Sequence, residues 1–271
     1  MKVLIRLFSF KDWDHKQIAE FHQTIQRLQS ETQDRRGLLN IVAAEHARSD
    51  QFTPGKQVAL RQALISFGGD AIHPLSEQAR LSNSPEVRIS AVFALTKINH
   101  SDTIPVLLQY IENSNYWVAL TCVKGLAERK DARSIEPFLT LLNGHRWRQL
   151  TGEKTKFHVV SVDIAVQIRF MAAESLAEMG ESRVFAHLLE MTGDTGVAQH
   201  AVSGLEKLLI RNSASLSELE LQQLIELKDL YQKPIESDYY RGYYTNKLEP
   251  VSCTNLERMA RDELDRRRKA N

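Results

Sequence analysis

A basic and aromatic segment at residues 144–158 is the strongest candidate for binding chemistry. Trp147 lies between two arginines in this segment, and Glu153 is its only acidic residue. The side chains that give it positive charge are Arg146, Arg148, Lys154 and Lys156. Guanidinium groups bind carboxylate or phosphate through paired N–H groups, and an aromatic ring can stack on a planar partner. We therefore expect the segment to bind an anionic partner. The alternative is that Trp147 and Phe157 fill the gap between the third and fourth units while the charges face water.

A second candidate is the tyrosine-rich run at residues 238–244. It holds four of the seven tyrosines of the chain, together with Arg241. Tyrosine and arginine are common at the energetic centre of protein interfaces because they bury a large area and keep a polar end. Tyr240 and Arg241 are therefore predicted binding residues. The alternative is a tail that crosses the last repeat with its rings in the core.

The sequence contains none of the common short motifs of catalysis or metal binding. The patterns GxGxxG, GxxxxGK[ST], GxSxG, HExxH and CxxC are all absent. His22, Glu45 and His46 could meet around a metal ion only if two N-terminal helices bring them together, and ordinary surface residues are the favoured interpretation. We predict no catalytic residue, no metal and no cofactor.

The composition is that of a globular protein with an ordinary core. The chain has 271 residues, of which 42% are hydrophobic and 25% are charged, and its formal net charge is +1. This near balance argues against a surface built wholly for nucleic acid or anionic lipid. There are two cysteines, no signal-peptide pattern and no apolar run of about 18 residues, which favours a cytoplasmic protein without a membrane span.

A repeat of about thirty residues organises the middle of the chain. Its best copy is Val87/Ala91/Leu95, in which a branched residue, a small residue and a leucine follow at intervals of four. The pattern recurs at Val118/Cys122/Leu126, Ile168/Ala172/Leu176 and Val197/Ala201/Leu205, and in degenerate form at Ala59/Ala63/Phe67. This spacing places the three residues on one helix face, where the small residue lets a neighbouring helix approach. A second apolar stripe follows each copy, so the unit is a helix pair, and Cys122 is expected to be a small buried side chain.

Capping residues support this assignment. Ser84 before Pro85 is typical of a helix start. Polar residues that can cap the second helices are Asp70, Asp102, Asp131 and Ser182. An insertion of about twenty residues near 144–162 interrupts the array of helix pairs. Alternation typical of a strand occurs only at residues 2–10.

The stretch at residues 84–112 resembles a HEAT repeat of the short phycobilisome-lyase-like type. The resemblance is carried by Ser-Pro-Glu-Val-Arg-Ile-Ser-Ala-Val-Phe-Ala-Leu at 84–95 and by Asp-Thr-Ile-Pro-Val-Leu-Leu at 102–108. It covers roughly residues 56–211 and implies an all-α superhelix, a HEAT-like α-solenoid of stacked helix pairs. Families with such repeats include scaffolds, adaptors, bilin lyases and a few enzymes, so the resemblance defines the fold more narrowly than the function.

Three regions are expected. Residues 1–55 form a helical N-terminal cap, residues 56–211 hold about five HEAT-like helix pairs, and residues 212–271 form C-terminal helices with an irregular tail. Asp12 is expected to cap the first long helix, and the run from Ser217 to Glu220 is a capping box that opens a later one.

These observations favour a non-catalytic scaffold or adaptor. It would bind another protein with an acidic surface, through the concave face of the second helices and the loop at 144–158. One alternative is a bilin lyase or chaperone, which the resemblance implies. The other is a nucleic-acid-binding protein, which the near-neutral charge disfavours and only the basic loop supports.

Overall fold

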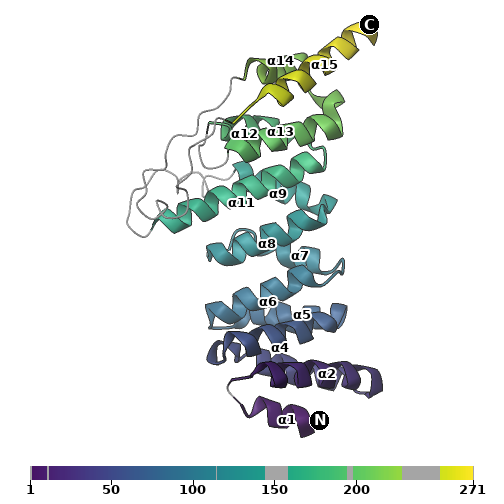
Figure 1. The fold of residues 1–271 in the computed structure, drawn as a ribbon, viewed down its shortest axis with the longest axis vertical. Helices are drawn as coiled ribbons and strands as arrows, with labels where there is room; N and C mark the ends of the chain where they lie inside the picture. Colours follow the sequence, from purple (N-terminus) through teal and green to yellow (C-terminus); the bar gives the residue numbers. More distant parts are fainter. Residues whose placement is uncertain are drawn as a thin grey trace. The chain divides into compact units, whose positions relative to one another are not determined.

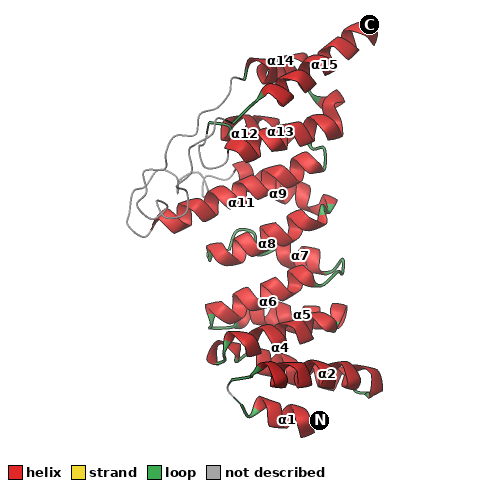
Figure 2. Cartoon of the chain, viewed as in Figure 1, coloured by secondary structure: helices red, strands yellow, loops and turns green. Residues whose placement is uncertain are grey.

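The computed structural model describes residues 2–10, 12–113, 115–143, 158–193, 198–227 and 251–270, with the side chains of the longest helix described from residue 167 onward. These residues are helical and contain no strand (Figure 2). The chain divides into two compact units, unit 1 at residues 1–126 and unit 2 at residues 127–271. The predicted all-α, HEAT-like fold is therefore confirmed. No described helix is long and apolar enough to cross a lipid bilayer.

Unit 1 consists of a short helix followed by successive helix pairs (Figure 1). The short helix is α1 (Lys2–Phe8). The pairs are α2 (His15–Glu31) with α3 (Arg35–His46), α4 (Pro54–Ser66) with α5 (Ile72–Leu81), and α6 (Pro85–Lys97) with α7 (Thr103–Leu108). The next first helix is α8 (Tyr116–Arg129), and the boundary of the unit falls in its last turn. We call α4, α6 and α8 the first helices, and α5 and α7 the second helices.

The alternating pattern at residues 2–10 does not form a strand, because Lys2–Phe8 form helix α1. Leu4 and Leu7 lie one turn apart and are both buried, so an apolar pair at helical spacing decides the conformation. The predicted N-cap Asp12 is also wrong by two residues. Asp14 caps α2 instead, and the Gln17 side chain completes its capping box.

The other predicted caps agree with the structure in part. Ser84 accepts from the amide of Val87, and Asp131 accepts from that of Arg133. Asp102 is the N-cap of α7 but makes no side-chain bond to the helix. Glu181 rather than Ser182 caps the turn before the corresponding helix of unit 2, since its longer carboxylate reaches the amide of residue 183 at 3.2 Å.

Small residues line the contacts between successive first helices. Ala63, Ala91 and Cys122 occupy the same repeat position and are all buried. At the next turn of α8, a Cβ added to Gly125 would collide with the Thr96 side chain of α6. The first helices therefore pack closely enough that only small side chains fit between their backbones.

Unit 2 contains a second group of stacked helices. They are α9 (Ile135–Asn143), α11 (His158–Glu178), α12 (Phe185–Met191), α13 (Ala198–Asn212), α14 (Glu218–Glu226) and α15 (Thr254–Ala270). Helix α11 begins at His158, inside the insertion predicted at 144–162. The capping box from Ser217 to Glu220 is confirmed. Arg267, in the basic end of α15, donates to the carbonyls of Ser213 and Leu216 and so ties α15 to the turn before α14.

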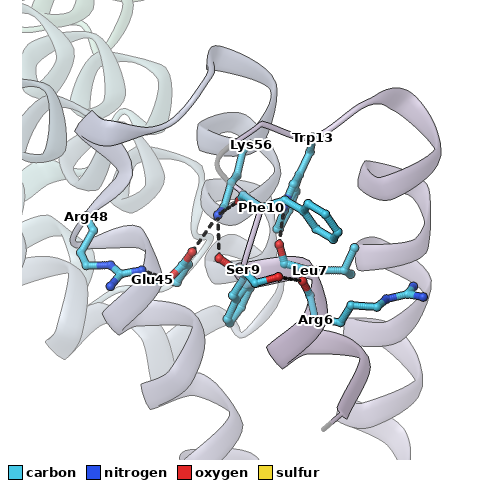
Figure 3. Close-up of polar contacts among 9 residues, drawn as sticks. Arg6, Leu7, Ser9, Phe10, Trp13, Glu45, Arg48 and Lys56 are labelled. Carbon is cyan, nitrogen blue, oxygen red and sulfur yellow. Dashed lines mark hydrogen bonds and ion pairs between the residues drawn. The ribbon is translucent and has the colours of Figure 1, made fainter.

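A buried lysine holds the N-terminal layer of unit 1 together (Figure 3). Lys56, on α4, is fully buried, and its Nζ lies 2.8 Å from Oε1 of Glu45 on α3. The same Nζ donates to the carbonyl of Phe10 at 2.7 Å and lies 3.6 Å from the centre of the Phe52 ring. Arg48 reaches the other carboxylate oxygen of Glu45 at 2.9 Å. A single ammonium group thus links α3, α4 and the segment after α1, in a site where an unpaired charge would be strongly unfavourable.

We predict that Lys56→Met destabilises unit 1 by about 3–5 kcal/mol, because it leaves the Glu45 carboxylate buried without its closest cation. The double variant Lys56→Met/Glu45→Gln should be less destabilised than the single variant. Urea unfolding followed by circular dichroism measures both. Arg27→Met removes one member of an exposed pair with Glu31 and is the matched control, with an expected loss of less than about 1 kcal/mol. A double variant that is no more stable than the single one would contradict this account.

Candidate functional site

The binding residues predicted from the sequence lie outside the described residues. They are Arg146, Trp147, Arg148, Lys154, Lys156, Tyr240 and Arg241. Their assignment stays a prediction, and the candidate site described below is made of other residues.

His46 and Glu45, two of the three residues considered as metal ligands, have other partners. His46 is fully buried, with Nδ1 2.5 Å from Oε1 of Gln78 and Nε2 2.9 Å from the hydroxyl of Ser90. The Gln78 amide nitrogen donates to the carbonyl of Ala43, so Nδ1–H of His46 is assigned as the donor to Oε1. Glu45 binds Lys56 instead. His46 therefore links α3, α5 and α6 as a neutral core residue.

The two cysteines are buried as well. Burial raises the pKa of the Cys122 thiol well above its usual value, so the nucleophilic thiolate is disfavoured there. Cys253 is 2% exposed, at the start of the segment that leads into α15. Cys122 thus acts as the small buried side chain that its repeat position predicts.

Large apolar side chains are exposed on three successive first helices of unit 1. Val58 on α4, Phe93 on α6 and Trp117 on α8 are 38%, 37% and 53% exposed. The outward surface of these helices also carries basic side chains. We define the first-helix face by these apolar and basic side chains and one acidic one: Val58, Arg61, Glu86, Phe93, Lys97, Trp117 and Lys124.

The repeat register places these residues on one surface. Val58 and Trp117 each come five positions before the small buried residue of their helix, whereas Phe93 and Lys124 come two positions after it. First helices run in the same direction because each is followed by a second helix that returns the chain. Equivalent positions therefore point the same way, and the face spans about 20 Å across three helices and about 10 Å along them.

Arg61 and Phe93 join neighbouring helices within the face. The guanidinium carbon of Arg61 lies 4.4 Å from the centre of the Phe93 ring, a favourable cation–π distance. The Nε of Arg61 is buried and has no hydrogen-bond partner, and partial burial lowers the pKa of this guanidinium. Within the part of the chain that the structure describes, no carboxylate lies within ion-pair distance of Arg61. Arg61 is therefore a cation that stacks on an aromatic ring and has no carboxylate partner among the described residues.

The second helices of unit 1 present a different surface. Arg80 on α5 is paired with Glu77 at 2.8 Å. In α5 and α7, the one large apolar side chain that is strongly exposed is Leu81, at the end of α5. In the groove between α1 and α2, Arg6 likewise pairs with Glu20 at the wall.

No residue of the first-helix face was predicted from the sequence to bind a partner. A usable signal was present, because Phe93 and Trp117 are large apolar residues at repeat positions off the buried stripe. The sequence could not show that Arg61 lacks a carboxylate partner, because this depends on which side chains surround the guanidinium group in the folded chain.

Comparison with known proteins supports the repeat assignment. Residues 72–151 match the family model of HEAT repeats, from the start of α5 through α9. No match was found among curated proteins. HEAT repeats generally serve as protein-interaction scaffolds. The phycobilisome-lyase-like type stays a prediction.

We predict that His46 makes unit 1 sensitive to acid. Burial lowers the pKa of His46 to about 4, and the positive charge of Arg61 acts in the same direction. The unfolded chain therefore takes up this proton at higher pH than the folded chain, so stability is lost as the pH falls from 6.5 to 4. The loss is on the order of 3 kcal/mol. Urea unfolding across this range should show a smaller pH-dependent loss for His46→Gln than for the unaltered chain; equal losses would contradict the assignment.

Proposed function

We propose that this chain is a non-catalytic scaffold that binds another protein through the first-helix face of unit 1. The observation that carries the proposal is the exposure of Val58, Phe93 and Trp117 on three successive helices. Apolar side chains that gather on one surface, interleaved with basic groups, are typical of protein interaction sites.

The composition of the face supports this function further. Aromatic residues and arginine are enriched at interface centres, and truncating such residues commonly weakens binding about tenfold or more. Trp117, Phe93 and Arg61 are residues of this kind on a rigid helical surface. The segment at 144–158, the run at 238–244 and the concave surface of the second helices stay additional predicted contact regions.

Selection from a random peptide library on the immobilised full-length chain tests the proposal. We expect enriched peptides whose dissociation constants rise at least about tenfold for Phe93→Ser and for Trp117→Ser. Ile5→Ser is the matched control, because it removes an exposed apolar side chain from α1, outside the first-helix face and the second helices, and it should leave binding unchanged.

Three outcomes would overturn the proposal. The first is that no peptide is enriched over an unrelated helical protein. The second is that the selected peptides are insensitive to both face variants. The third is that free bilins or oligonucleotides bind, that their dissociation constants rise in the same variants, and that peptides do not bind. That pattern would favour one of the two alternative functions.

A further inference from the structure

The geometry points to an acidic peptide segment, with an apolar side chain beside its carboxylates, as the ligand of the first-helix face, and to Arg61 as the residue that selects it. This inference rests on the proposed function and deepens it, because it names the chemistry of the partner.

Among the described residues of unit 1, Arg61 is the arginine with a buried side-chain nitrogen that has no hydrogen-bond partner. Arg35, Arg48 and Arg80 have carboxylate partners at 3.3 Å, 2.9 Å and 2.8 Å. Arg61 has none in the described residues, although its Nε is buried and its planar group lies on a ring that holds it in place. A guanidinium that is partly removed from water and lacks an acceptor gains more from a carboxylate than a fully solvated one does.

A second cation lies near the same ring. The ammonium group of Lys97 is 5.8 Å from the centre of the Phe93 ring, beside which Arg61 already lies. A second basic side chain at this ring adds to the positive character that Arg61 gives this part of the face. Burial lowers the pKa of Arg61, because its charge is held partly out of water.

The charge of the three first helices extends this positive character over the face. Within unit 1, helices α4, α6 and α8 carry five basic residues and one acidic residue. One of the basic residues, Lys56, is buried against Glu45 and does not contribute. Glu86 lies in the same row as Val58 and Trp117 and repels any anion placed beside it. A phosphate backbone is charged along its whole length, whereas a peptide can place an uncharged residue at that position. Mixed apolar and basic character thus favours an acidic polypeptide over nucleic acid.

The size of the face indicates a segment rather than a globular surface. A stable interface between folded proteins covers about 800 Å² on each side, whereas a face of about 20 by 10 Å is much smaller. An extended peptide of about six residues crosses such a distance. Side chains on one edge of the peptide can then contact Phe93 and Trp117 while a carboxylate reaches Arg61.

Fluorescence anisotropy with labelled peptides and the full-length chain tests the inference. The probes are an alternating Glu/Leu peptide of about eight residues, matched Lys/Leu, Ser/Leu and Glu/Ser peptides, and a single-stranded oligonucleotide. We expect the Glu/Leu peptide to bind most tightly, with an affinity that falls as salt is added. Arg61→Gln should weaken this binding at least about tenfold, and Arg61→Lys should retain part of it because the charge remains but the planar fork is lost.

The matched control is Arg27→Gln, which removes an arginine that is already paired with Glu31 on α2 and should leave the affinity unchanged. Thermal melts establish that each variant is folded. Suppose that the Ser/Leu peptide binds as tightly as the Glu/Leu peptide, and that Phe93→Ser abolishes binding while Arg61→Gln does not. The acidic-ligand inference then fails and the scaffold function stands. If no peptide binds and library selection also yields none, both fail. Arg61-dependent binding of the oligonucleotide alone overturns the inference in favour of nucleic acid.

Discussion

Close contact between successive first helices at their small-residue positions is the constraint on which the rest of unit 1 depends. Ala63, Ala91 and Cys122 are buried at the same repeat position, and Gly125 has no room for a Cβ beside Thr96. This packing sets the rotation of each helix about its own axis. Once the rotation is set, the positions two residues after and five residues before the small residue must face outward. The same register that builds the core therefore creates the first-helix face.

Two cations of unit 1, Lys56 and Arg61, lie in contrasting environments. Lys56 is fully buried and has a carboxylate, a carbonyl and an aromatic ring around its ammonium group, so its charge is compensated within the structure. Arg61 is only partly buried and has the aromatic ring but no carboxylate among the described residues. The first arrangement holds helices together and has no capacity for another partner. The second leaves N–H groups available, which is the condition for binding an external anion.

The helix pairs could be predicted from the sequence because their signal is local. A branched residue, a small residue and a leucine at intervals of four define a buried helix face wherever they occur. Caps were less predictable, since Asp14 replaces Asp12 and Glu181 replaces Ser182 according to which side chain reaches the amide. The first-helix face was not predicted, because the exposure of Phe93 and the unpaired state of Arg61 depend on neighbouring helices far apart in sequence. The binding segments predicted from the sequence are instead residues 144–158 and 238–244, where basic or aromatic residues are clustered along the chain.

The stack of Arg61 on Phe93 also bears on how an exposed apolar face can remain soluble. A guanidinium over an aromatic ring covers one side of the ring and presents N–H groups to water in its place. Phe93 is consequently only 37% exposed, although its repeat position faces outward. A neutral apolar ligand would have to displace this cover or leave the guanidinium with still less access to water. A carboxylate beside an apolar side chain avoids that penalty, because it pairs with the guanidinium while its neighbour contacts the remaining edge of the ring. The arrangement that keeps the face compatible with water thus also discriminates between ligands.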